Sequence, residues 1–175
     1  MARKRPDVTC GSMVTALGTR YSGVMGNRPE LLCKVIGMGR AAGGVRGISL
    51  EASDTLVAAA IVVPDATLLV AGENGIGKRT PFDEYRVQSR GGKGIITMKT
   101  GDKTGNVIGA LTVKDADEIM LITAAGQMVR TFVKDIREAG RNTMGVKLVN
   151  LDAGDKLQAI APVISESAGD EQSPA

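Results

Sequence analysis

The sequence predicts an all-β fold built from repeated, propeller-like blades. Short apolar runs of strand length, such as residues 67–71 and 119–123, are each followed by a turn that contains glycine. Apolar patterns with the period of a helix are missing over any convincing length. The strand pattern also recurs at an interval of about fifty residues, which suits a blade of four short strands.

The repeat is visible in two features of the chain. A G-(V/G)-(R/K) core is separated by 47 and then by 54 residues. Its three copies are Gly44-Val45-Arg46, Gly91-Gly92-Lys93 and Gly145-Val146-Lys147. In the same phase, residues 69–80 align with residues 120–131, so that Gly75 matches Gly126, 51 residues later. Two features that repeat in one phase indicate blade units and not unrelated elements.

The remaining strands follow from apolar runs between turn residues. They are expected at residues 95–99, 106–112, 127–132, 146–151 and 156–163. Asp102, Asp117, Asp152 and Gly154 supply the turns between them.

These strands divide the chain into five segments. We expect a divergent or poorly ordered basic lead-in at 1–36, a partial blade at 37–63, complete blades at 64–113 and 114–163, and an acidic tail at 164–175. The lead-in lacks the Asn-Gly type of hairpin found in the later units. A partial set of about two to three blades leaves strand edges open, so we also expect self-association through them.

Composition narrows the classes of function. The chain has no histidine, which excludes an ordinary zinc site and histidine-based acid–base catalysis. Cys10 and Cys33 show no spacing typical of a metal site, and two cysteines of this kind are expected in a reduced, cytoplasmic protein. No apolar stretch is long enough to span a membrane. Without the three carboxylates of residues 164–175, the formal charge rises from +3 to +6, which is compatible with a polyanionic partner.

The candidate binding site is the heptapeptide Gln88-Ser89-Arg90-Gly91-Gly92-Lys93-Gly94. Glycine permits tight turns and the close approach of a bulky partner, while the two cations suit phosphate. Further cations stand near turns or strand ends in related phases of the repeat. They are Lys78, Arg79, Arg86, Lys99, Arg130, Arg137, Arg141 and Lys147. The simpler alternative is that some of them pair with nearby carboxylates.

The heptapeptide resembles the gyrase A box, a motif of the C-terminal domain of DNA gyrase A, with Ser89 at a position where that family usually has a cation. The resemblance extends from residue 37 to about residue 163. Three more motifs carry it: Asn74-Gly75-Ile76-Gly77-Lys78-Arg79-Thr80-Pro81, the run from Gly39 to Ile48, and the run from Gly140 to Lys147.

This resemblance implies a β-pinwheel, in which neighbouring blades exchange a strand, and suggests that the chain is the last part of a normally six-bladed domain. It implies sequence-independent, salt-sensitive binding and bending of duplex DNA in support of negative supercoiling. The implied partners are the N-terminal region of gyrase A and the gyrase B protein, in a nucleoid-associated, cytoplasmic enzyme. The chain alone is expected to have no catalytic activity and no cofactor, since Mg²⁺ and ATP belong to other parts of the enzyme. The position of the box in a late blade leaves its share in wrapping open.

Three alternatives remain at this point. The chain also resembles the C-terminal domain of the related topoisomerase IV protein, and a propeller-type protein-interaction module without DNA binding fits the same strand pattern. Finally, residues 72–79 nearly match the phosphate-binding P-loop G-x-x-x-x-G-K-(S/T), with Arg79 at the last position.

Overall fold

The computed structural model describes residues 12–19, 28–34, 46–50, 54–87 and 91–163, and within these ranges it contains eleven strands and two short 3₁₀ helices. The strands are β1 (Ser12–Thr19), β2 (Arg28–Lys34), β3 (Asp54–Ile61), β4 (Thr67–Gly72), β5 (Ile76–Pro81), β6 (Ile95–Met98), β7 (Val107–Val113), β8 (Glu118–Thr123), β9 (Met128–Phe132), β10 (Val146–Lys147) and β11 (Leu157–Val163). The helices are η1 (Phe82–Glu84) and η2 (Val133–Asp135). The predicted all-β fold is confirmed.

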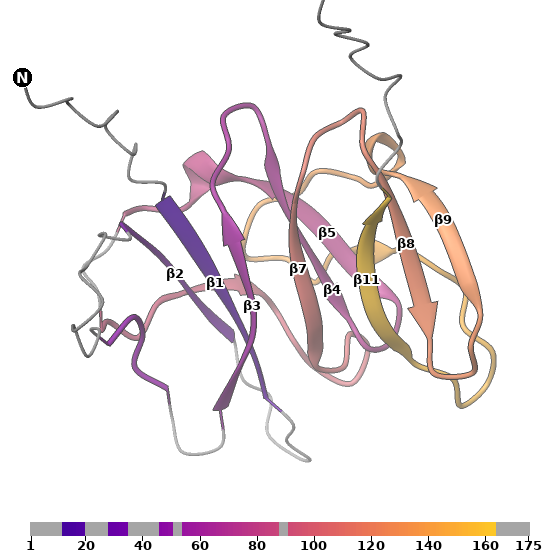
Figure 1. Ribbon diagram of the computed structural model, residues 1–175. Helices are drawn as coiled ribbons and strands as arrows, with labels where there is room; N and C mark the ends of the chain where they lie inside the picture. The colour runs from indigo at the N-terminus through magenta and orange to yellow at the C-terminus, as the bar shows by residue number, and fades with distance from the viewer. Residues whose placement is uncertain (1–11, 20–27, 35–45, 51–53, 88–90, 164–175) are drawn as a thin grey trace, which may run out of the picture.

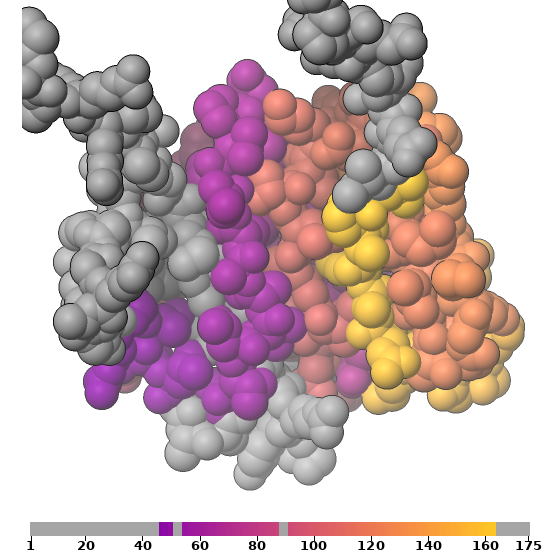
Figure 2. Space-filling view, in the orientation of Figure 1, coloured from indigo at the N-terminus to yellow at the C-terminus, as the bar shows by residue number. Residues whose placement is uncertain are grey.

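Three antiparallel sheets lie side by side in chain order (Figure 1). The strand orders are β3-β1-β2-β6 in the first sheet, β10-β5-β4-β7 in the second and β11-β8-β9 in the third. We call these sheets blades one, two and three. In the space-filling view, β11 lies against β7 on one side and against β8 on the other, so that blades two and three meet without a gap (Figure 2).

Blades one and two are each completed by a strand from the next unit. The fourth strand of blade one is β6, which pairs with β2 although it lies beyond β5 in the sequence. The fourth strand of blade two is β10, which pairs with β5 through Val146 opposite Gly77 and Lys147 opposite Ile76. This exchange of strands between neighbours is the pinwheel arrangement.

Strand β4 is buried on both faces because blade two lies between the other two blades. Leu68 and Val70 belong to the apolar core shared with blade one, whereas Leu69 and Ala71 belong to the core shared with blade three. All four side chains are at most 1% exposed. A strand covered on both sides needs a continuous apolar run, which explains the sequence of this segment.

Blade three, in contrast, is covered on one face only. In β8, Ile119 and Leu121 are fully buried against blade two, while Met120 and Ile122 between them are only partly buried. In β9, Met128 is 69% exposed and Phe132 is 46% exposed. Within the described chain, no other sheet packs on this second face.

The segment expected to be a lead-in contains two strands of blade one. Strands β1 and β2 pair with each other over residues 12–16 and 30–34, and β1 also pairs with β3. Apolar runs at residues 13–17 and 31–33 supply strand-forming sequence, but the turn residues between them differ from the Asn-Gly hairpins of the later units. The partial blade expected at 37–63 therefore supplies only β3 to a four-stranded sheet.

The strands for which bounds were predicted lie close to them, except that β10 is shorter than the predicted strand at 146–151. The backbone N–H groups of Leu148 and Val149 both donate to the carbonyl oxygen of Gly75, at 2.8 and 3.4 Å, which ends the regular ladder. Among the described residues, no helix is long and apolar enough to cross a membrane.

Candidate nucleic-acid interface

The described part of the box is a glycine turn fixed by main-chain hydrogen bonds. Gly91 and Gly94 have φ angles of 77° and 81°, a region that side chains other than glycine rarely enter. The Gly91 N–H donates to the Gly47 carbonyl at 2.7 Å, and the Ser49 N–H donates to the Gly92 carbonyl at 2.9 Å. The turn is thus anchored to residues 47–49 of the preceding unit. Gln88, Ser89 and Arg90 lie outside the described residues.

Four cations gather around this turn and strand β6, and we call them the β6 cluster: Arg46, Lys93, Lys99 and Arg141. Lys93 follows the glycine pair directly, and the Cδ atom of Arg46 would lie 3.9 Å from a Cβ atom built on Gly91. The Lys99 N–H donates to the Thr143 carbonyl at 3.1 Å, which brings the 140–143 turn of the next unit to the end of β6.

Arg141 completes the β6 cluster from that turn. Its Nη1 atom donates to the Ile96 carbonyl at 3.2 Å. Its Nε atom lies 3.9 Å from a carboxylate oxygen of Glu84, which is too long for a hydrogen bond. Residues of three consecutive units therefore lie along this turn and strand β6.

Most of this positive charge faces solvent. Arg46, Lys93 and Lys99 are exposed, and none of the three has a carboxylate partner in the part of the chain that the structure describes. Unpaired surface cations on turns are suited to neutralising phosphates. Arg46 was not among the predicted contacts, although the repeat core made it equivalent to Lys93.

Lys78 was predicted to face DNA, and this prediction is wrong. Its side chain is fully buried. Its Nζ atom donates to the carbonyl oxygens of Gly140 and Arg141, both at 2.6 Å, and to Thr143 Oγ1 at 3.1 Å. A buried ammonium needs such partners, and here they tie the 140–143 turn of unit three to strand β5 of blade two.

Arg79 is also unavailable to a partner, because it is only 9% exposed. Its Nε atom donates to the Ile136 carbonyl at 2.7 Å, and its Nη1 atom is paired with the carboxylate of Asp115. The second cation of the Gly77-Lys78-Arg79 motif thus serves the junction between blades as well.

The other predicted cations lie on the surface, and one of them is already engaged in an ion pair. Arg130 on β9 is paired with Glu118 on β8. Lys147 is exposed on β10, and Arg86 and Arg137 are exposed after η1 and η2. The structure therefore concentrates the candidate site on fewer residues than the sequence did.

The P-loop alternative does not fit the geometry. A P-loop is followed by a helix whose N-terminus points at phosphate. Here residues 72–76 form the hairpin between β4 and β5, and Lys78 lies inside a strand with its ammonium on backbone carbonyls.

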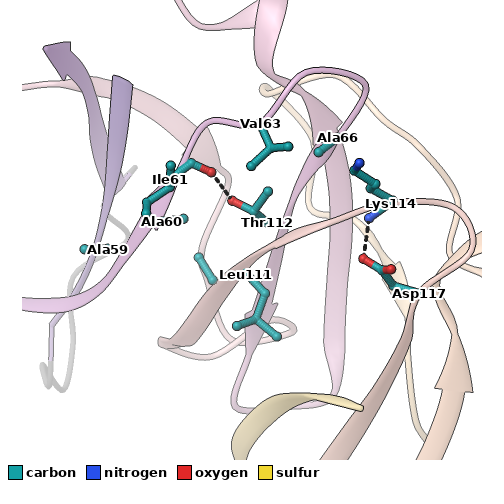
Figure 3. Close-up of a pocket in the computed structure, with 10 residues that line it drawn as sticks. Ala59, Ala60, Ile61, Val63, Ala66, Leu111, Thr112, Lys114 and Asp117 are labelled. Carbon is teal, nitrogen blue, oxygen red and sulfur yellow. Dashed lines mark hydrogen bonds between the residues drawn. The ribbon is translucent and has the colours of Figure 1, made fainter. Parts of the chain in front are cut away.

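A groove of about 450 Å³ lies at the seam between β3 and β7 (Figure 3). Its walls are mainly alanine and aliphatic side chains, among them Ala59, Val63 and Leu111. The Thr112 hydroxyl in it donates to the Ile61 carbonyl at 2.6 Å, and the Asp117 carboxylate accepts from the Lys114 N–H at 2.8 Å. Each of these polar groups is already bonded to a main-chain group, and no cluster of metal-ligating side chains occurs among the residues described.

Comparisons with known proteins agree with this geometry. The family model described as DNA gyrase C-terminal domain, beta-propeller, matches residues 32–62, 66–114 and 117–164. The chain is 49% identical over 124 residues to the DNA gyrase A protein of Mycolicibacterium smegmatis, covering 71% of this chain and 15% of that protein. It is 44% identical over 131 residues to the DNA gyrase A protein of Mycobacterium leprae, covering 75% of this chain and 10% of that protein. The chain thus spans only a small fraction of these relatives.

Among solved structures, the chain matches one described as the structure of a DNA gyrase A C-terminal domain, with a TM-score of 0.73 and 26% identity. That match covers 88% of this chain and 51% of the solved chain. A crystal structure of the C-terminal domain of DNA topoisomerase IV gives the same TM-score at 21% identity and shows the shared fold. Because three consecutive segments match the family model and together cover most of the chain's length, this chain belongs to the DNA gyrase C-terminal domain family.

Proposed function

We propose that this chain binds duplex DNA through the β6 cluster and bends it around the outer edge of the blades. The observation that supports this most directly is that Arg46, Lys93, Lys99 and Arg141 lie along the anchored turns and strand β6, and that the first three are exposed to solvent. The main-chain bonds between residues 47–49 and 91–92 hold these turns in place before a partner arrives. Preorganised cations lose less conformational entropy on binding than cations on free loops.

The site recognises the DNA backbone and not the base sequence. A turn surface of cations and glycines offers charge and exposed backbone to phosphates, but the described residues at the β6 cluster include no group of amide or carboxylate side chains for base edges. Any preference among sequences would therefore come from how easily the DNA bends.

In a full-length relative, such bending would serve the supercoiling reaction of DNA gyrase. The identities of 44–49% to gyrase A proteins favour this enzyme over topoisomerase IV. By the same reasoning, the rest of gyrase A and the gyrase B protein are the proposed protein partners, and the breakage of DNA and hydrolysis of ATP belong to them.

The test is binding to a duplex of about 150 base pairs across a salt series. If about five phosphates are neutralised, the log–log slope of affinity against salt is near −4.5. A Lys93→Ala/Lys99→Ala variant should bind more weakly and should lower the magnitude of that slope by about 1.8. A matched Lys114→Ala/Lys134→Ala variant removes the same charge from other exposed sites and should keep most of the slope.

Equal losses in the two variants would mean that only net charge matters and would count against the β6 cluster. Salt-insensitive association, or no binding by folded protein, would support the protein-interaction alternative instead.

A further inference from the structure

Blade three has an open edge where the other two blades have a fourth strand. Blade one receives β6 and blade two receives β10, each from the following unit. In the third sheet the order ends at β9, and no strand of the described chain pairs with its outer edge. In Figure 1, β9 forms the right-hand end of the molecule.

The backbone groups on this edge can be identified by alternation. In the β8–β9 hairpin the Gln127 carbonyl accepts the Thr123 N–H at 2.9 Å, so the main-chain groups of Gln127 point toward β8. Successive residues of a strand alternate in direction, so the main-chain groups of Met128 and Arg130 point away from β8. These two residues present the donors and acceptors that an added strand would use.

A largely apolar face borders the open edge. Met120, Ile122, Met128 and Phe132 share one side of the β8–β9 pair with the ion pair of Glu118 and Arg130, as the register shows. On the equivalent side of blade two, Leu69 and Ala71 are fully buried by blade three. The face of blade three is thus built like one that another blade covers.

The first unit carries a segment that matches this edge. Residues 46–50 belong to the repeat that provides β6 and β10 in the later units, yet they belong to no sheet. One side of this segment is used by the box turn, through the Gly47 carbonyl and the Ser49 N–H. Ile48 lies between them, so its own N–H and carbonyl point to the other side, and Leu50 beyond it is 40% exposed.

We propose that two copies of this chain close a ring, in which residues 46–50 of each copy add a strand to the outer edge of β9 in the other. The two contacts are equivalent by two-fold symmetry, and both open ends are used. The size agrees, because one copy covers 51% of the solved gyrase A C-terminal domain and two copies together match its length. This proposal concerns assembly and does not depend on DNA binding.

Sedimentation equilibrium of the full chain, without DNA, tests the assembly. We expect a mass of twice the 18.2 kDa of one chain at micromolar concentration. Met128→Pro removes an outward N–H of β9 but no bond of the β8–β9 ladder, so it should raise the dimer dissociation constant at least about tenfold. The matched Met128→Ala variant keeps that N–H and should change the constant much less.

Amide hydrogen exchange of the unmodified chain locates the contact even if a proline variant folds poorly. The Met128 and Arg130 amides should become slower to exchange as the protein concentration rises, together with the Ile48 amide. A monomer at all concentrations would overturn the proposal, as would a dimer without this protection. A mass that grows continuously with concentration would show an open chain of copies and would also overturn the closed pair.

Discussion

The two junctions between blades use the same strand exchange but different side chains. At the junction of blades two and three, β5 carries Lys78, Arg79 and Thr80, and all three side chains bond to the chain segment that leads into β10. The pairing of β2 with β6 corresponds to the pairing of β5 with β10. By this correspondence, Leu31, Leu32 and Cys33 stand at the junction of blades one and two where Lys78, Arg79 and Thr80 stand at the second junction.

The difference teaches that strand exchange alone does not decide how firmly a junction is held. The second junction adds side-chain hydrogen bonds to the carbonyls of Ile136, Ala139, Gly140 and Arg141, and those from Lys78 and Arg79 are charge-assisted. The first junction relies on apolar packing and on main-chain bonds between residues 47–49 and 91–92. We therefore expect the second junction to be specific and intolerant of change, and the first to be more permissive.

Replacing Lys78 by Met should give the largest effect. Met keeps much of the apolar volume but removes the charged donor that the carbonyls of Gly140 and Arg141 and the Thr143 hydroxyl share, which we expect to cost about 3 kcal/mol of unfolding free energy. Urea unfolding followed by circular dichroism measures this loss.

Lys103→Met is the matched control, because Lys103 is exposed in the turn before β7. Its cost should stay below about 0.5 kcal/mol. If the two variants unfold at the same urea concentration, the contacts of Lys78 do not stabilise the junction.

A methyl group at Gly145 should give the next largest effect. Gly145 has a φ angle of 98°, and a Cβ atom there would overlap the carbonyl group of Gly77, which is backbone and cannot move aside without opening the β5–β10 pairing. Gly145→Ala should cost about 2 to 3 kcal/mol, from left-handed strain together with this clash.

Gly91→Ala makes the same change at the first junction, where the nearest atom to the new methyl group, the Arg46 carbonyl oxygen, lies 3.7 Å away. There only the left-handed strain of about 1 kcal/mol remains. Equal costs for Gly91→Ala and Gly145→Ala in urea unfolding would mean that the junctions do not differ in how closely their backbones approach.

The fold could be predicted because its signals are local. Apolar runs determine the strands, and glycines with positive φ at positions such as 75 and 126 determine the hairpins between them. Strands β1 and β2 were missed because the first unit lacks this hairpin signal, and their membership of a blade depends on β6, which lies more than sixty residues later.

The candidate site was predicted only in part, for a different physical reason. A lysine in a polar segment looks the same in sequence whether it faces solvent or a buried carbonyl. The partners of Lys78 are 62 to 65 residues away, and two of the three are backbone atoms without any signature in the sequence. Lys93 and Arg141 were expected on turns because of the glycines around them, and turns lie at the surface.

The smallest expected effect concerns one turn that recurs in units two and three. Residues 101–104 and 152–155 close alike, with the Thr104 N–H on the Gly101 carbonyl and the Asp155 N–H on the Asp152 carbonyl. Unit two has a hydroxyl at the last position and unit three a carboxylate. Hydrogen bonds from Thr123 and from the Lys156, Ala125 and Ala124 backbone hold the pKa of Asp155 below its usual 3.8.

Because the folded-state pKa is depressed, Asp155 contributes stability that is present above pH 3.8 and is lost as the pH falls through the folded value. Asp155→Asn should therefore lower the melting temperature at about pH 6, and the difference from the unchanged chain should vanish near about pH 2.5. Thr104→Val removes the equivalent hydroxyl, which does not ionise in this range, so its cost should be the same at both pH values. A cost of Asp155→Asn that does not vary with pH would show that shape, and not charge, makes this residue useful in the turn.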